Sequence, residues 1–255
     1  MKDDRINQFI DELNQTIAPN YQITKEIFNR EYGYPELDPL RDEICKCLIC
    51  GLYQAAITLT NHLLESSLKK CLAIKYKIEH ENVQLELKDA FKKSIEKYDK
   101  MELNMTINQA CSQNLISKTQ KKRLHKFRED FRNAFSHAES SKIFKDLSIP
   151  VNILSIEKNE GPEDVMKKFF SSPNSELTIK DFLPIQGILQ AKYAQITAIP
   201  YFCAVDKIIR DMVAILDNLI NKKQAGGFGL SACFLFIRLS KIATISRIIL
   251  STAQK

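Results

Sequence analysis

Apolar residues recur every three or four positions along most of this chain, which is the spacing of helices that bury one face. The most regular segment covers residues 117–140. Ser117 and Gln120 have the spacing of a capping box, so we expect a helix to begin at Lys118. Its core-facing stripe contains Leu124, Phe127, Phe131, Ala134, Phe135 and Ala138. The opposite side carries the basic residues Lys121, Lys122, His125, Arg128 and Arg132.

The N-terminal part of the chain has a shorter pattern of the same kind. Residues 6–17 have the spacing of an amphipathic helix, which we expect to end around Pro19 because proline inside a helix removes a hydrogen bond. The stretch from there to Pro39 is rich in tyrosine and irregular in pattern. We therefore interpret residues 1–37 as a helix followed by a connector.

A second helical region begins at Asp38, where an N-cap acid is followed by Pro39 at the first helical position. The helical pattern continues to about residue 76, and Gly51 is a candidate break within it. The part that follows Gly51 is apolar on more than one side. That distribution predicts a helix in the centre of a bundle.

The remaining patterns predict further helices and little extended structure. We expect helices near residues 90–101, 106–113, 185–198 and 201–221, with a kink or split at Pro200, and a short extended piece within 149–156. The predicted fold class is all-α, an up-and-down helical bundle with an N-terminal helical extension and a C-terminal helical tail. The three segments are residues 1–37, the bundle at 38–222, and a Gly-containing break with an apolar tail at 223–255.

Composition narrows the class of protein. The chain of 255 residues is 44% hydrophobic and 27% charged, which is typical of a soluble globular protein. We find no signal peptide behind Met1, and most of the 7 cysteines lie in apolar helical patterns, so we expect reduced thiols and a cytoplasmic location. The tail at 230–250 carries Arg238, Lys241 and Arg247, which argues against a transmembrane span and favours a packed helix or subunit contact. The net charge of +6 permits a polyanionic partner.

No cofactor or metal motif stands out. Cys45, Cys47 and Cys50 lie two, three and five positions apart on a predicted helix, so they cannot all face one ion. The glycines at 226–229 are not followed by the Lys-Ser or Lys-Thr of a phosphate-binding loop. We expect neither a cofactor nor a metal.

Three candidate catalytic residues, Arg132, Asn133 and His137, lie near the end of the 117–140 helix. Asn133 and His137 are four residues apart and therefore neighbours on one helix face. Arg132 and His137 are five apart, which on a regular α-helix leaves them roughly 140° apart around the axis. A site that uses both needs a helix end near His137 or a second copy of the chain facing the first.

These residues resemble the Arg-x4-His signature of HEPN domains, which are helical bundles. The preceding Ala-rich helix, with its ending Leu64-Glu65-x-x-Leu68-Lys69, is similar to the first core helix of several HEPN groups. Many HEPN proteins are metal-independent endoribonucleases that act as homodimers, with two Arg and two His lining one cleft. The resemblance implies such an activity here, and some members are toxins or anti-phage effectors with a regulatory or antitoxin partner.

RNA cleavage without a metal needs a base, a cation at the phosphoryl oxygens, and an acid for the leaving oxygen. His137 is suited to proton transfer near neutral pH, and the planar guanidinium of Arg132 matches phosphate geometry. Asn133 could bind the phosphate or orient the arginine, and Glu65 could position Arg132. Residues that could hold the RNA backbone are Lys118, Lys121, Lys122, Arg123, Lys126 and Arg128.

Simpler interpretations remain open at each position. Arg132 could be a solvated surface charge, and His137 a cation that complements a helix C-terminus. Glu65 could be an exposed acid paired with Lys69 at four-residue spacing. Some HEPN toxins carry a tyrosine two residues after the histidine, where this chain has Glu139, which argues against that particular toxin–antitoxin arrangement. A non-catalytic HEPN-like module for dimerisation or nucleotide binding is the alternative function.

Overall fold

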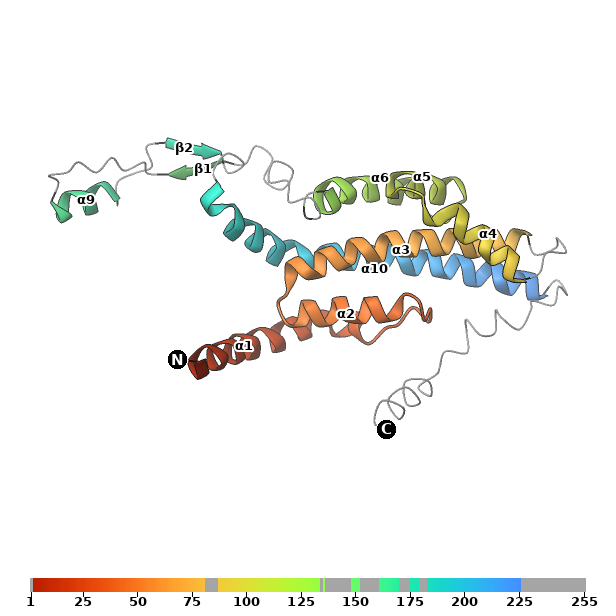
Figure 1. The fold of residues 1–255 in the computed structure, drawn as a ribbon, viewed down its shortest axis with the longest axis horizontal. Helices are drawn as coiled ribbons and strands as arrows, with labels where there is room; N and C mark the ends of the chain where they lie inside the picture. Colours follow the sequence, from red (N-terminus) through yellow and green to blue (C-terminus); the bar gives the residue numbers. More distant parts are fainter. Residues whose placement is uncertain are drawn as a thin grey trace.

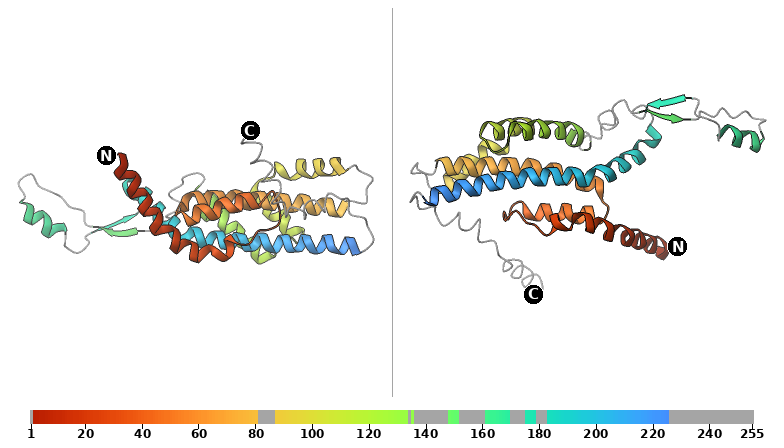
Figure 2. Two further views of the ribbon diagram at one scale, coloured as in Figure 1. Left: turned by 90° about the horizontal axis from the view of Figure 1, so that it is seen from below. Right: turned by 180° about the vertical axis from the view of Figure 1, so that it is seen from behind.

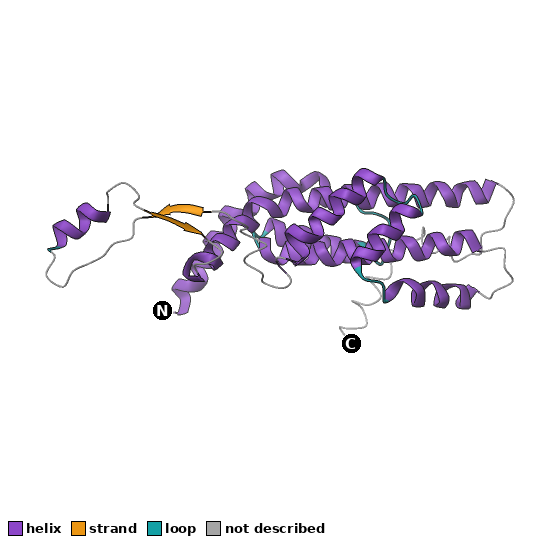
Figure 3. Cartoon of the chain, turned by 90° about the horizontal axis from the view of Figure 1, so that it is seen from above, coloured by secondary structure: helices purple, strands orange, loops and turns teal. Residues whose placement is uncertain are grey.

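The structure is a computed structural model that describes residues 2–80, 87–133, 135, 148–151, 161–169, 175–178 and 183–225. Its helices are α1 (Lys2–Phe28), α2 (Asp38–Ile49), α3 (Tyr53–His80), α4 (Leu87–Asp99), α5 (Leu103–Ser112), α6 (Lys118–Phe127), the π-helix η1 (Arg128–Asn133), α9 (Pro162–Phe169) and α10 (Leu183–Ala225). The strands β1 (Ser148–Val151) and β2 (Ser175–Thr178) form an antiparallel pair. The all-α helical bundle is confirmed (Figures 1 and 3).

The centre of the bundle is formed by α3 and α10, which lie side by side along most of their lengths (Figures 1 and 2). Helix α3 also contacts α2, α4, α5 and η1, so its predicted central position is confirmed. Its buried side chains include Leu63, Leu64, Leu68 and Leu72, and those of α10 include Phe202 and Met212. Elements β1, β2 and α9 extend from the end of the bundle where α10 begins (Figure 2).

Helix α1 is longer than predicted, because it continues through Pro19 to Phe28. Asn20 and Thr24 follow the proline and are buried. The amide of Asn20 donates to the carbonyl oxygen of Leu48 at 2.8 Å, and the Thr24 hydroxyl donates to the carbonyl oxygen of Asn20 at 2.8 Å. The second half of α1 packs against α2. This packing outweighs the local tendency of Pro19 to break the helix.

Gly51 separates α2 from α3, as predicted. It has a φ of +75°, a backbone conformation that L side chains rarely adopt. A Cβ at this position would also lie 2.8 Å from the Thr16 methyl group of α1. Both the turn and the close approach of α1 therefore require a glycine here.

Asp38 does not cap α2, which corrects the prediction. It is the first residue of the helix, and the N-cap position is held by Leu37. Its carboxylate instead accepts the backbone N–H groups of Tyr32 at 2.7 Å and Tyr34 at 2.9 Å. The acid therefore shapes the connector between α1 and α2.

A buried ionic network attaches this connector to α10. Asp206 accepts from the Nε of Arg41 at 3.1 Å, from the hydroxyl of Tyr32 at 2.7 Å and from the Nε of Arg210 at 2.8 Å. Arg210 also donates to the carbonyl oxygens of Arg30 and Glu31. Burial, followed by the charge of Asp206, raises the pKa of Tyr32 above its usual range, so its hydroxyl remains a donor. The network joins α2, α10 and the connector.

Of two predicted helix boundaries, the start at Lys118 is present and the split at Pro200 is not. The capping box is confirmed: Ser117 and Gln120 exchange both hydrogen bonds, and α6 begins at Lys118. Pro200, in contrast, does not split α10, which is a single helix from Leu183 to Ala225.

No described helix is long and apolar enough to cross a membrane, and the apolar tail at 230–250 lies outside the described residues.

We expect Asp206→Ala to destabilise the protein by about 3–5 kcal/mol, because it leaves Arg41 buried without its counter-charge. Chemical denaturation followed by circular dichroism measures this change. Asn218→Ala on the exposed side of the same helix is the control and should cost less than about 1 kcal/mol. Equal losses in the two variants would show that the network has no special role.

Candidate active site

The end of the 117–133 segment is held by stacked aromatic rings. The ring of Phe131 stacks on Tyr201 of α10 with centroids 4.1 Å apart, and Phe127 meets the same ring edge-on at 5.1 Å. Phe135 stacks on Tyr193 at 6.2 Å. Phe131 lies in the same core as Leu63, and Phe127, Phe135 and Leu59 pack against that core. The aromatic stripe thus attaches η1 to α10.

A hydrogen bond extends this attachment to α3. The Tyr201 hydroxyl donates to Oδ1 of Asn61 at 2.7 Å, and both residues are buried. Burial raises the pKa of Tyr201, so the hydroxyl stays protonated. Asn61 lies one helical turn before Glu65 on the same helix, which places the aromatic attachment next to the candidate acid. Neither Tyr201 nor Asn61 belongs to a local motif, so their pairing could not be predicted from the sequence pattern.

The predicted regular helix changes form at Arg128. Residues Arg128–Asn133 form a π-helix, in which hydrogen bonds join residues five apart instead of four. The angle of roughly 140° between Arg132 and His137 assumed a regular α-helix, so that premise is wrong for the segment that contains Arg132. Short π-helical segments often occur at functional sites.

Arg132 faces Glu65. One guanidinium nitrogen, Nη2, lies 3.9 Å from Oε2 of Glu65, and both side chains are partly exposed. The other carboxylate oxygen, Oε1, lies 3.0 Å from Nζ of Lys69. Glu65 therefore contacts both Arg132 and Lys69, so its two interpretations do not exclude each other. Lys69 also donates to the carbonyl oxygen of Asp99 at 2.7 Å, which links α3 to the end of α4.

The structure describes only the backbone of Asn133, and it does not describe His137. Asn133 is the last residue of η1, and its side chain lies outside the described part of the structure. His137 also lies outside the described residues. Their roles, and the Arg132–His137 pair, therefore stay predictions.

The predicted RNA-binding residues do not share one face. Lys118, Lys121 and Lys122 line a hollow of about 480 Å³ together with His125 and Cys111. Arg123 instead lies over the ring of Phe127, at 5.2 Å, and borders a second hollow between α6 and α10. Lys126 is exposed on the surface of α6. Arg128 pairs with Glu129 at 3.7 Å. Three lysines thus share one basic surface on α6.

His125, which the sequence pattern places on the same basic side as Lys121 and Lys122, also lines this hollow. Its Nε2 lies 3.3 Å from Oδ1 of Asn108 on α5. Burial, followed by the positive charges of Arg128 and Lys121, lowers the pKa of His125. The ring is therefore mainly neutral at physiological pH, and its positive neighbours attract anions without its help. Among the described residues, no cluster of His, Cys, Asp and Glu could hold a metal ion.

Comparisons of the chain with protein-family models, curated proteins and solved structures found no match. The HEPN resemblance therefore depends on residues of this chain alone, namely the Arg132–His137 motif and the helix ending Leu64-Glu65-x-x-Leu68-Lys69.

We expect Tyr201→Phe to destabilise the protein by about 1–3 kcal/mol, because it leaves the buried Asn61 oxygen without its donor while keeping the ring stack. The double variant Tyr201→Phe, Asn61→Leu should recover part of the loss, since it removes both polar partners. Thermal unfolding of the three proteins tests this. A double variant no more stable than the sum of the two single losses would contradict the assignment.

Proposed function

We propose that this protein is a metal-independent endoribonuclease of the HEPN type. In the reaction, the ribose 2′-oxygen loses its proton to a base and attacks the adjacent phosphorus atom. The new 2′-oxygen–phosphorus bond forms as the bond from phosphorus to the 5′-oxygen breaks, and an acid protonates the leaving 5′-oxygen. The products are a 2′,3′-cyclic phosphate and a 5′-hydroxyl.

The contact between Arg132 and Glu65 is the observation that supports this proposal. A transition-state cation must be held in place but remain able to meet the phosphate. At 3.9 Å the pair is an ionic contact and not a hydrogen bond, so Glu65 itself takes up none of the N–H donors of the guanidinium. The arginine is partly exposed, and η1 is fixed behind it by the stack of Phe131 on Tyr201.

The remaining roles come from the chemistry of the side chains. His137 acts as the base and, in the partner copy, as the acid, since histidine exchanges protons near neutral pH. Asn133 hydrogen-bonds the phosphate or orients Arg132. Lys118, Lys121 and Lys122 bind the RNA backbone along the hollow on α6, which gives a sequence-independent contribution to binding.

A composite site across a homodimer completes the proposal. The HEPN arrangement places two copies of Arg132 and His137 in one cleft around a twofold axis, and twofold dimers are the commonest oligomers. An enzyme that cuts cellular RNA must be restrained in its own cell. We therefore propose that it acts as a toxin or anti-phage effector in the cytoplasm, under a regulatory or antitoxin protein.

We expect His137→Ala and Arg132→Ala to abolish cleavage of total RNA in the presence of a chelator, with the helical content unchanged. Arg132→Lys should recover little activity, because an ammonium does not reproduce the planar fork of donors. Gel analysis of the RNA products measures the effect. Arg5→Ala, which changes an exposed arginine on α1, is the matched control and should cut like the wild type. Cleavage by His137→Ala equal to wild type would support the non-catalytic dimerisation or nucleotide-binding module instead.

We also expect a mixture of inactive Arg132→Ala and His137→Ala chains to regain partial activity. In the mixed dimer, one composite site can contain an intact arginine from one chain and an intact histidine from the other. Subunit exchange is verified first with differently tagged chains. Continued inactivity after proven exchange, or a monomer at working concentration, would rule out the shared site.

A further inference from the structure

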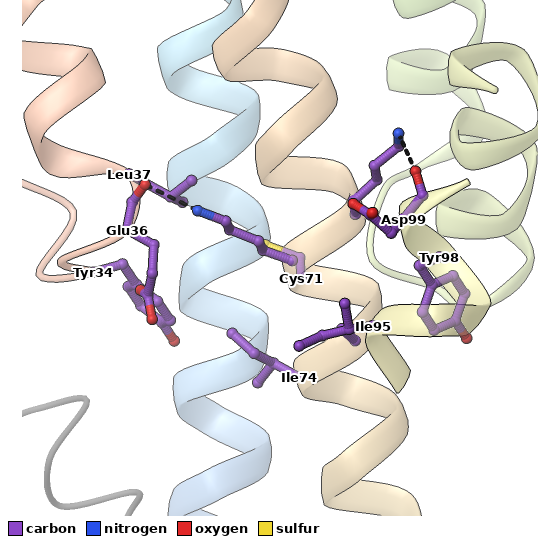
Figure 4. A pocket seen from close by; sticks show the side chains of 11 residues that line it. Tyr34, Glu36, Leu37, Cys71, Ile74, Ile95, Tyr98 and Asp99 are labelled. Carbon is purple, nitrogen blue, oxygen red and sulfur yellow. Dashed lines mark hydrogen bonds between the residues drawn. The ribbon is translucent and has the colours of Figure 1, made fainter. Parts of the chain in front are cut away.

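A separate pocket of about 310 Å³ lies between the connector, α3 and α4 (Figure 4). Its walls are mainly apolar and come from Tyr34, Leu37, Cys71, Ile74, Ile95 and Tyr98. Burial raises the pKa of Cys71 to about 12, so its thiol stays protonated and this wall carries no charge. Half of the Ile95 side chain remains exposed at the entrance. The pocket is therefore a preformed apolar site with an open mouth.

The size of the pocket limits what it can hold. Small-molecule sites begin at roughly 300 Å³, and an apolar cavity of about 150 Å³ holds one benzene molecule. A volume of about 310 Å³ therefore corresponds to a compact apolar body of about two fused rings.

Two lysine side chains, Lys69 and Lys70, line the rim of the pocket. The ammonium of Lys69 is compensated by Glu65, as described above. Lys70 donates to the carbonyl oxygen of Glu36 at 3.0 Å, but within the described part of the chain no carboxylate lies within ion-pair distance of it. An anionic ligand group would supply the missing counter-charge.

Two carboxylates also border the pocket, and their positions leave the Lys70 side open. The carboxylate of Glu36 is turned toward Tyr34 (Figure 4), and Lys70 bonds to the backbone oxygen of Glu36 and not to this carboxylate. Asp99 lies on the opposite rim (Figure 4), and its backbone oxygen accepts from Lys69 at 2.7 Å. Both acids are exposed, so water screens their repulsion of a ligand anion.

We propose that this pocket binds a small carboxylic acid with a compact apolar body of about two fused rings. The body lies between Ile74 and Ile95 above Cys71, and the carboxylate replaces the Glu36 carbonyl as the acceptor for Lys70. The site shares only Lys69 with the Glu65–Arg132 contact, and binding does not depend on the proposed nuclease activity.

The test is titration of the full chain with 2-naphthoate by calorimetry, with 2-naphthalenemethanol as the uncharged probe of the same shape. The wild type should bind naphthoate saturably and about two- to fivefold more tightly than the alcohol, which is the range of a partly exposed ionic contact. Lys70→Gln should remove that preference. Ala73→Phe places a ring in the pocket and should abolish binding of both probes, whereas Ala55→Phe adds the same ring to an exposed position of α3 and should not.

Several outcomes would overturn the proposal. Absence of saturable binding to the wild type disproves the site, and undiminished binding by Ala73→Phe places the probe elsewhere. Equal affinity for the two probes disproves the carboxylate. If Ala73→Phe does not fold, Ile95→Ala replaces it, because shortening an exposed side chain at the entrance removes wall contacts without disturbing the core. Unweakened binding by that variant contradicts the assignment. Loss of cleavage activity in the His137→Ala assay has no bearing on any of these results.

Discussion

The bundle depends on the packing of α3 against α10. Two other parts of the described structure are attached to this pair by specific polar and aromatic contacts. The connector and α2 are attached through Asp206, whose charge compensates Arg41 inside the protein. The candidate site is attached through Tyr201, which stacks on Phe131 and bonds to Asn61. Asp206 and Tyr201 lie five residues apart on α10, so one stretch of that helix supports both the N-terminal elements and the site.

Local chemistry predicted those features whose causes are local. The capping box at Ser117 and the break at Gly51 each depend on a few adjacent residues, and both are present. Features that depend on distant contacts were predicted wrongly. Pro19 lies inside α1, and Pro200 does not split α10, because tertiary packing outweighs their local cost; the alternative of a kink at Pro200 stays a prediction. Asp38 binds the connector instead of capping α2, since the chain before it turns back toward the carboxylate.

The candidate site was predictable to a similar extent. The pattern identified Arg132 at the end of a basic, aromatic helix, and the resemblance pointed to Glu65, 67 positions earlier, whose carboxylate lies 3.9 Å away. The sequence did not predict the π-helix, because a wider turn has no residue signature comparable to a cap. It also gave no indication of Tyr201 and Asn61, which contribute through pairing across the bundle and not through spacing along the chain.

The position of Lys69 explains how Arg132 could change partners during the proposed reaction. Partly exposed ionic contacts such as Arg132–Glu65 contribute about 0–1 kcal/mol, whereas a guanidinium that meets a phosphate with two parallel hydrogen bonds gains more. An incoming phosphate would therefore draw Arg132 away from Glu65. The carboxylate would not be left without a counter-charge, because Lys69 stays 3.0 Å from its other oxygen. Lys69 is itself held by the Asp99 carbonyl and so need not move. An acid paired with Arg132 alone would lose its only counter-charge when the arginine moved to a phosphate. Glu65 also contacts Lys69, so it keeps a counter-charge when Arg132 moves.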